Sequence, residues 1–253
     1  MGAEHHCSES RGEDWQSRYA EIARLAGGLA HEIRNPLSTI SLNLELLEED
    51  LAEGGSPRER RLMQRVQLVR RECEQLERIL NSFLEFARAG ELRPEAVSIN
   101  HQIREFLRFF AAEAQQHGVE VVAHLAAELP LVPLDTRLFQ QVLQNLARNA
   151  VQAMPHGGRL ELLTYLAEDA ASEPRVVLEL IDSGVGMDPE TQRKMYEVFF
   201  TTKPGGSGLG LPTVKKIVEA HGGRIMCESE RGRGTRFRLF WPVVRESILA
   251  PVS

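Results

Sequence analysis

The chain has 253 residues, of which 42% are hydrophobic and 26% are charged. This length and composition predict one large or two ordinary globular domains. Its net charge of -6 argues against a broad surface for nucleic acid or anionic membranes. The longest uncharged interval, 204–214, is too short for a membrane-spanning helix. The polar start lacks a signal peptide, and the three cysteines form no CxxC pair. We therefore expect a cytoplasmic protein without a membrane-inserted segment.

The first third of the chain has the pattern of two long helices joined by a turn. Residues 1–12 are a polar tail, and residues 13–94 hold two charged segments separated by the turn-forming residues 53–57. Apolar residues recur at steps of three and four in both segments. They are Ile22, Leu25, Leu29, Ile33, Leu37, Ile40, Leu44, Leu47 and Leu51, then Leu62, Val66, Val69, Cys73, Leu76, Ile79, Phe83 and Phe86. A hairpin this long cannot cover its own apolar stripe, so we expect a homodimeric four-helix bundle.

Residues 95–245 mix helical and strand patterns, and residues 246–253 form a short tail. Helices are expected over 100–117, from Asp135 to Ala153, and over 212–220, where Pro212 stands in the first turn. Strands are expected over 119–124, 159–166, 175–181, 224–228 and 235–241. The sequence thus predicts an α+β protein, in which a helical hairpin precedes an α/β sandwich of helices on one sheet.

His31 lies on the first predicted helix, about 200° round from the apolar residue Leu29, and therefore faces water. A helical surface histidine is more often without a role, but its neighbours favour a nucleophile here. Glu32 can accept an imidazole proton and make the other ring nitrogen more reactive. Pro36 removes a backbone donor one turn later and costs helix stability, which indicates a function other than helix formation.

Three further groups of residues become informative together. Asn145 and Asn149 share one helix face, where their oxygens can bind Mg²⁺, although such a pair usually faces solvent. Asp182 ends a predicted strand, and Gly184 and Gly186 follow it. A carboxylate there can accept a hydrogen bond from an exocyclic amine, while the glycines let backbone approach a flat ring.

A glycine cluster over 205–210 leads directly into a helix, where backbone donors and the helix N-terminus can hold an anion. Such clusters are more often simple turns. This one is not a Rossmann fingerprint, because no strand leads straight into it, and it is not a P-loop, because no Lys-Ser/Thr pair follows.

Taken in order, six motifs resemble those of two-component sensor histidine kinases over about residues 20 to 242. They are the histidine motif HEIRNPL, the asparagine pair, the Asp182 glycine motif, YEVFFTTK at 196–203, the glycine motif at 206–211 and GRGT at 232–235. The histidine motif and the short segment before the glycine motif most resemble the nitrogen-regulation class. Tyr196 and Val198 depart from the usual Phe and Pro, which puts the docking of the nucleotide lid in doubt.

The resemblance implies a dimerisation and phosphotransfer hairpin followed by a Bergerat-type ATP-binding domain. His31 would be the phosphoacceptor and Glu32 its acid/base partner, and Asn35, one turn later, would orient a water for dephosphorylation. Asn145 and Asn149 would hold Mg²⁺ on ATP, and Asp182 would bind the adenine amine. The other implied nucleotide-binding residues are Gly184, Gly186, Lys203, Gly206, Gly208, Leu209, Gly210 and Thr235, and Gly232 and Gly234 would shape the far wall.

The implied reaction is autophosphorylation of His31 by Mg-ATP and transfer to an aspartate in the receiver domain of a response regulator, with a phosphatase activity as well. Gyrase-type ATPases share this kind of site but carry a glutamate base at the position of Asn145, and an inactive dimeric scaffold would not need every motif intact. No sensory domain is recognised before residue 13 or after residue 245, so we expect either input from a separate sensory protein or that this chain is the core of something longer. The helix over 13–25, with Trp15 and Tyr19, is a candidate for signal entry, and its alternative is a plain helix end.

Overall fold

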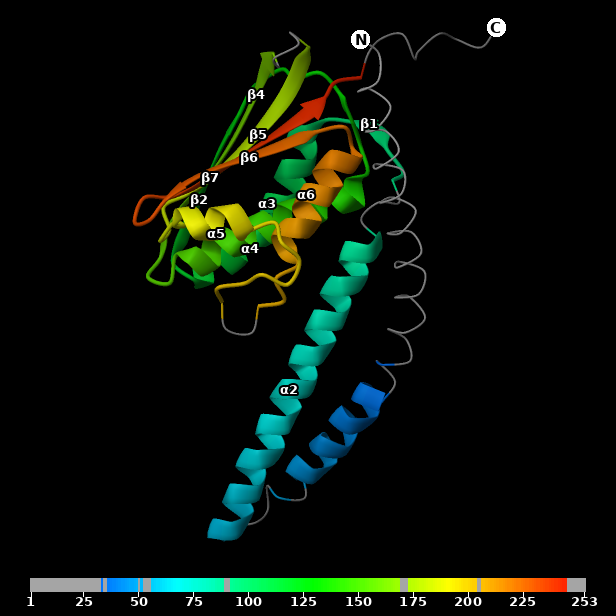
Figure 1. Cartoon of the computed structure of the whole chain (residues 1–253), viewed down its shortest axis with the longest axis vertical. Helices are drawn as coiled ribbons and strands as arrows, with labels where there is room; N and C mark the ends of the chain where they lie inside the picture. The colour runs from blue at the N-terminus through cyan, green and yellow to red at the C-terminus, as the bar shows by residue number, and fades with distance from the viewer. Residues whose placement is uncertain are drawn as a thin grey trace, which may run out of the picture. The chain divides into compact units, whose positions relative to one another are not determined.

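The computed structural model describes residues 33, 36–49, 51, 56–88, 92–168, 173–203 and 206–244 (Figure 1). The chain divides into two compact units, residues 1–88 with 203–207 and residues 89–202 with 208–253, which we describe separately. Several predicted residues lie outside the described part. They are His31, Glu32, Asn35, the segment over 13–25 and both terminal tails.

The first unit contains the two helical segments predicted for the hairpin. Residues 36–49 are helical, and α2 spans Pro57–Arg88. A capping box begins α2: the Ser56 N–H donates to Glu59 Oε2 (2.8 Å), and the Glu59 N–H donates to Ser56 Oγ (3.2 Å). The sequence predicts a turn over residues 53–57. The two bonds between Ser56 and Glu59 fix where the second helix begins.

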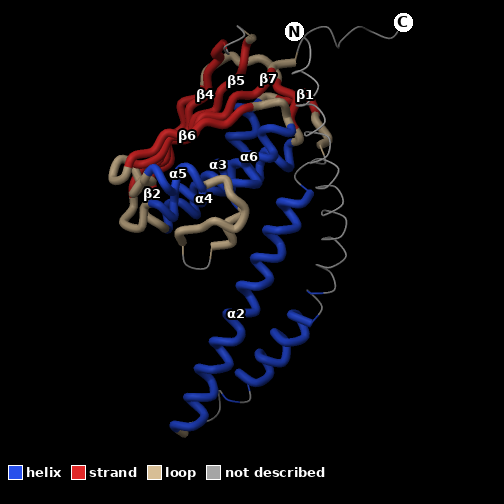
Figure 2. Tube along the Cα trace, in the orientation of Figure 1, coloured by secondary structure: helices blue, strands red, loops and turns tan. Residues whose placement is uncertain are grey.

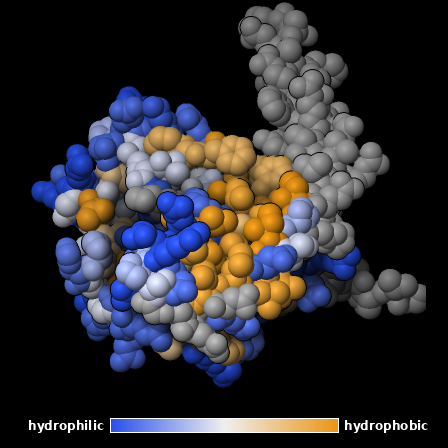
Figure 3. All heavy atoms as spheres, turned by 90° about the horizontal axis from the view of Figure 1, so that it is seen from below, coloured by the Kyte–Doolittle hydropathy of each residue, from blue (hydrophilic) through white to orange (hydrophobic). Residues whose placement is uncertain are grey.

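The two hairpin helices bury few side chains between them. Leu37, Leu44 and Cys73 form a small core against which Val66 packs, and the Arg70 guanidinium pairs with Glu48 at 2.9 Å. Many apolar side chains of the hairpin remain more than one third exposed; they are Ile33, Ile40, Leu42, Leu46, Leu47, Leu62, Leu68, Val69 and Leu76. Figure 3 draws the whole chain from below and shows hydrophobic residues exposed at the surface beside hydrophilic ones. The hairpin by itself therefore leaves apolar surface uncovered.

The second unit is a layer of helices on a five-stranded sheet. Its helices are α3 (Ile99–Gln116), α4 (Thr136–Ala153), α5 (Pro189–Lys194) and α6 (Gly210–Ala220). The sheet strands are β2 (Val119–Leu125), β4 (Gly158–Glu168), β5 (Pro174–Asp182), β6 (Arg224–Glu230) and β7 (Gly234–Pro242). They lie in the order β2-β4-β5-β7-β6, with only the β2–β4 pair parallel. The predicted α+β fold is confirmed.

The core of this unit lies between the sheet and α3, α4 and α6, which cover one of its faces (Figure 2). Asp135 begins α4 as predicted, because its side chain accepts the Leu138 N–H at 3.0 Å. Trp241 from β7 is fully buried and packs edge-on against Phe139 of α4, with ring centroids 5.4 Å apart. This contact joins α4 to the sheet, and α4 carries the two predicted asparagines.

Three short elements were not predicted, and one helix begins earlier than expected. β1 (Glu95–Val97) pairs antiparallel with β3 (Val132–Leu134) outside the main sheet. Strands of three residues are too short to give a period, and a helix of six residues such as α5 shows little more. α6 begins at Gly210 rather than at Pro212, so the last glycine of the motif is already helical. No helix in the described ranges is long and apolar enough to cross a membrane.

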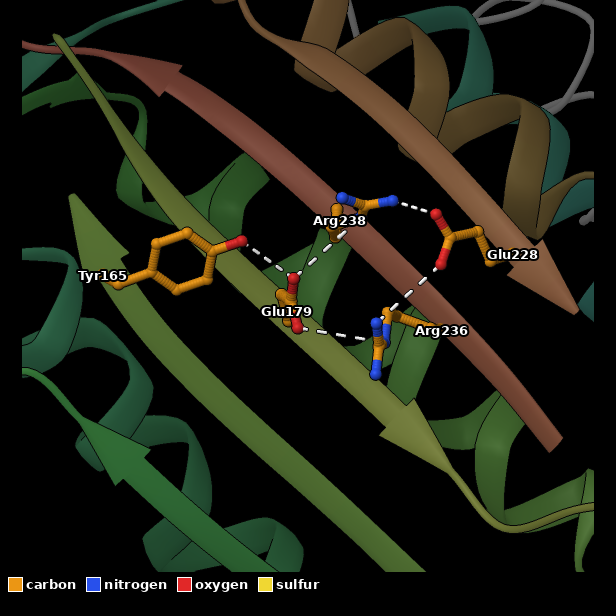
Figure 4. A network of polar contacts seen from close by, with 5 residues as sticks. All are labelled: Tyr165, Glu179, Glu228, Arg236 and Arg238. Atoms are coloured by element: carbon orange, nitrogen blue, oxygen red, sulfur yellow. Dashed lines mark hydrogen bonds and ion pairs between the residues drawn. The ribbon is translucent and has the colours of Figure 1, made fainter. Parts of the chain in front are cut away.

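A charged network crosses the face of the sheet opposite the helices (Figure 4). Glu179 of β5 is only 8% exposed, and its Oε1 accepts the Tyr165 hydroxyl at 2.8 Å. Arg236 and Arg238 of β7 both lie 3.9 Å from the Glu179 carboxylate and also pair with Glu228 of β6. Burial and the neighbouring Glu179 carboxylate raise the pKa of Tyr165 to about 12. The network therefore links four adjacent strands through one buried carboxylate.

We predict that Glu179→Gln lowers the pKa of Tyr165 toward 10, because the variant keeps the side-chain shape but loses the charge that opposes phenolate formation. The folded wild type binds more protons than the unfolded chain between about pH 10 and 12, so its stability falls as pH rises through that interval. This loss should be smaller in the variant. Tyrosine absorbance titration measures the pKa, with Tyr165→Phe to assign the signal, and an unchanged titration would contradict the role of Glu179.

Candidate nucleotide-binding site

Asp182 is held at the end of the central strand β5. It is 7% exposed, and its Oδ1 accepts the Gly184 N–H at 2.9 Å, which leaves the chain turned sharply after the strand. Thr235, another predicted site residue, stands opposite Asp182 in the β5–β7 register and is equally buried. The structure thus brings three predicted residues, Asp182, Gly184 and Thr235, together at one end of the sheet.

The backbone around Asp182 is packed too closely for side chains at two glycines. Gly234 has a φ of +87°, and a Cβ there would lie 1.9 Å from the Asp182 carbonyl oxygen. Gly186 has a φ of +63°, and its Cβ would lie 2.1 Å from the Glu230 carbonyl oxygen. Glycine is needed at both positions, for the left-handed conformation and for the approach of two backbones. These contacts fix the loop after β5 against the turn between β6 and β7.

Ser229 of β6 joins this loop to the sheet and was missed by the sequence analysis. Its hydroxyl accepts the Met187 N–H at 2.8 Å, donates to the Gly234 carbonyl at 3.0 Å and lies 3.0 Å from Thr235 Oγ1. Gln192 of α5 adds two bonds, from its Nε2 to the carbonyls of Met187 and Ser229. The only sequence signal for Ser229 is its alternation with Ile225 and Cys227 on the half-buried side of β6.

Asn145 and Asn149 are half-buried on α4 and lie across from the start of α6. A Cβ on Gly210 would lie 3.7 Å from Asn145 Oδ1 and 3.8 Å from Asn149 Nδ2. The structure therefore brings together the asparagine pair and the end of the glycine motif. The first turn of α6 has backbone N–H groups and no side-chain cap, so this junction presents carboxamides beside a helix N-terminus.

The other predicted residues near the glycine motif lie in different surroundings. Gly208 accepts the Phe199 N–H through its carbonyl at 3.1 Å, and Phe199 is the one non-glycine residue with positive φ in the described ranges. Leu209 is fully buried, so its side chain belongs to the core rather than to a ligand surface. Lys203 and Gly206 fall in residues 203–207, which belong to the first unit.

Burial makes the titratable groups near Asp182 poor nucleophiles. The pKa of the Cys227 thiol is raised to about 12 by burial and by the charge of Asp182, so the thiol is neutral at ordinary pH. Burial also raises the pKa of Tyr196, whose hydroxyl makes no hydrogen bond within the described residues. Lys215 lies 5.2 Å from the centre of the Tyr196 ring. The local chemistry suits binding rather than covalent catalysis.

The described residues contain no cluster of three His, Cys, Asp or Glu side chains that could hold a metal ion. A Mg²⁺ ion bound to a nucleotide needs only one or two protein oxygens, because phosphates and waters complete its octahedral shell. The two α4 carboxamides fit that requirement. A separate cavity of about 630 Å³ is lined by Glu113, Gln116, His117, Arg148, Val151, Gln152, Met154 and Pro155. It contains none of the predicted nucleotide residues, so we do not assign the nucleotide to it.

We predict that Gly234→Ala destabilises the second unit far more than Gly232→Ala. Both glycines have positive φ, but a Cβ on Gly232 meets nothing within 4 Å, so only the conformational strain of about 1–3 kcal/mol applies there. At Gly234 the added atom also collides with the Asp182 backbone. Denaturant unfolding of the two variants measures the difference. Equal losses of unfolding free energy would show that the approach to Asp182 does not constrain the fold.

Two families match the chain in succession. Residues 21–92 match the His Kinase A (phospho-acceptor) domain, and residues 134–245 match the histidine kinase-, DNA gyrase B-, and HSP90-like ATPase family. The sensor histidine kinase ZraS of Salmonella typhi is 32% identical over 229 residues, which are 90% of this chain and 47% of the relative. AtoS of Escherichia coli strain K12, a signal transduction histidine-protein kinase, is 32% identical over 226 residues, 89% of this chain and 36% of the relative. The chain thus spans less than half the length of these relatives.

Solved structures agree with both the fold and the family. Full-length ShkA in complex with AMPPNP superposes with a TM-score of 0.68 at 28% identity, covering 87% of this chain and 46% of that one. The nucleotide-free catalytic domain of the histidine kinase ThkA gives a TM-score of 0.51 at 29% identity, covering 60% of this chain and 97% of that one. The chain has a helical hairpin followed by a five-stranded sheet covered by helices, and the two families match these parts in the same order. The chain therefore belongs to the two-component sensor histidine kinases.

Proposed function

We propose that this chain transfers the γ-phosphoryl group of ATP to His31 and then to an aspartate in the receiver domain of a response regulator. The observation that supports this most strongly is the order of the two matched families along one chain, a phospho-acceptor domain followed by an ATP-binding domain. A ring nitrogen of His31 attacks the γ-phosphorus, ADP leaves, and Glu32 accepts the proton from the other ring nitrogen. ATP and receiver domains are available in the cytoplasm, which favours that location for both domains.

The geometry of the second unit supports specific roles in binding ATP. Asp182 accepts a hydrogen bond from the adenine amine, because its carboxylate lies at the end of β5 and the glycines that follow let backbone approach a flat ring. Gly184, Gly186 and Thr235 shape this side of the pocket. Asn145 and Asn149 bind the Mg²⁺ ion that accompanies the triphosphate. Lys203, the backbone of Gly206, Gly208 and Leu209, and the first turn of α6 at Gly210 bind the phosphates.

Homodimerisation of the hairpin is supported by its exposed apolar residues. Leu42, Leu68 and Leu76 are each more than half exposed in the single chain, and nine large apolar residues of the hairpin exceed one third exposure. Ile33, Ile40 and Leu47 recur every seven residues, as do Leu62, Val69 and Leu76, so each set lies on one helix face. A second hairpin packed against these faces would cover them and complete a four-helix bundle. Asn35 follows His31 by four residues in the sequence and orients a water toward the phosphorylated aspartate, which adds a phosphatase activity. A separate sensory protein is a candidate source of the signal.

We expect His31→Gln to abolish labelling of the protein by γ-labelled ATP, with ATP affinity near that of the wild type, because the nucleophile and the pocket belong to different domains. The wild type should carry label that is labile in acid and stable in alkali. His101→Gln, on the exposed side of α3, is the matched control and should keep the label. Glu32→Gln should slow the reaction by about 10²- to 10⁴-fold. Label remaining on the His31→Gln protein would refute the assignment.

Asn149→Ala should weaken binding of Mg-ATP far more than binding of ADP without metal, because the carboxamide acts through the ion. Calorimetric titrations with and without Mg²⁺ measure the two affinities. Gln144→Ala, an exposed position on the same helix, is the control and should change neither. If Asn149→Ala reduces both affinities equally, the side chain contacts the nucleotide or supports the fold, and the metal role is wrong.

A further inference from the structure

Asp135 bonds to three different segments of the second unit. Its Oδ1 accepts the Leu138 N–H at 3.0 Å, which caps α4, and its Oδ2 accepts the Arg93 N–H at 3.0 Å. Its own N–H donates to Nε2 of His221, the C-cap residue of α6, at 2.9 Å. Asp135 and His221 are each 6% exposed, so water competes little for these bonds. A helix cap alone would need only the first of the three.

His221 is fixed in one neutral form by its partners. Nε2 accepts a hydrogen bond and so carries no proton, while Nδ1 lies 2.8 Å from the Ile217 carbonyl and is the donor there. The ring also packs edge-on against Trp241, with centroids 5.7 Å apart. Burial lowers the pKa of His221, which agrees with the neutral form. The imidazole thus ties the end of α6 to the start of α4.

The three segments joined at Asp135 matter for the proposed reaction. Arg93 lies on the segment between the end of α2 at Arg88 and β1, so it belongs to the stretch of chain that joins the hairpin to the catalytic domain. α4 carries Asn145 and Asn149, and α6 begins at Gly210. Because His221 pairs with Asp135 at the start of α4 and Gly210 lies near the asparagines further along it, α4 and α6 run antiparallel, and the bond between Asp135 and His221 holds one end of this pair.

We propose that Asp135 and His221 are positioning residues that couple the joining segment at Arg93 to the two nucleotide-binding helices. The proposal rests on the proposed kinase function. The bond to Arg93 fixes the joining segment where it enters the catalytic domain, and through that segment it affects phosphoryl transfer to His31 rather than the binding of ATP. The bond between Asp135 and His221 fixes α6 against α4, and hence the alignment of Gly210 with the asparagine pair. The bond to Arg93 should therefore affect the rate of autophosphorylation, and the bond between Asp135 and His221 should affect the KM for ATP.

Asp135→Asn removes only the bond to the joining segment. Asparagine caps helices as well as aspartate, so its carbonyl oxygen keeps the Leu138 bond, but an NH₂ group replaces the acceptor for Arg93 N–H. We expect the rate of autophosphorylation at saturating ATP to fall by about 10-fold or more, since misplacing reacting groups by about 1 Å costs up to about 100-fold. The KM for ATP should stay within about twofold of the wild-type value, because the lost bond does not involve a residue that binds the nucleotide. Arg93→Ala keeps the backbone N–H and is the matched control.

His221→Phe removes the bond to α6 while keeping a ring against Trp241. We expect the KM for ATP to rise several-fold, because α6 is no longer held against the asparagine helix. His221→Gln places a carbonyl oxygen near the position of Nε2 and should restore the KM. A residue that only supports the fold would give no separation between rate and KM, because its loss would change the rate, the KM and the unfolding temperature together.

The decisive experiment measures autophosphorylation rate, KM for ATP and thermal unfolding of the full chain for the wild type and these four variants. The expected result is a slower rate with normal KM in Asp135→Asn, a raised KM in His221→Phe, and near-normal values in Arg93→Ala and His221→Gln. The proposal is overturned if Asp135→Asn matches the wild type, or if both Asp135→Asn and His221→Phe show a lower rate, a higher KM and a lower unfolding temperature together. A wild type without label would instead refute the kinase function.

Discussion

The site depends on the close approach of two backbone segments at the end of β5. The loop after Asp182 and the turn between β6 and β7 pass so near each other that Gly186 and Gly234 can carry no side chain. This packing holds the Asp182 carboxylate at a fixed position with its Oδ1 already bonded to Gly184. Because the backbone N–H of Gly184 holds the Asp182 carboxylate, the position of the carboxylate does not depend on another flexible side chain. Recognition of a base by one acceptor requires such a fixed position.

The helical side of the site depends on the antiparallel pair α4 and α6. Their polar ends meet where Gly210 faces Asn145 and Asn149, and their other ends meet where His221 accepts the Asp135 N–H. The base and the phosphates are thus assigned to different parts of the fold, the base to the rigid sheet end and the phosphates to a junction of helices.

The sequence predicted the five strands of the main sheet and the three long helices that cover it. These elements have seven or more residues, which is long enough for the hydrophobic period of 2 in a strand or 3.6 in a helix to be recognised. It did not predict β1 and β3, which show no period over three residues, or the capping box of Ser56 and Glu59. It indicated Asp182 and the asparagines through glycine and amide spacing. It could not indicate Ser229 or the partnership of His221 with Asp135, because those bonds join residues far apart in the chain and depend on the tertiary fold.

The central claim is that ATP binds between the end of β5 and the α4–α6 junction. A crystal structure of the chain with Mg²⁺ and a non-hydrolysable ATP analogue tests this most directly. The expected result places the adenine amine within hydrogen-bond distance of the Asp182 carboxylate and the metal ion beside Asn149. A nucleotide found in the cavity lined by Glu113 and Arg148, or bound with its base away from Asp182, would contradict the claim.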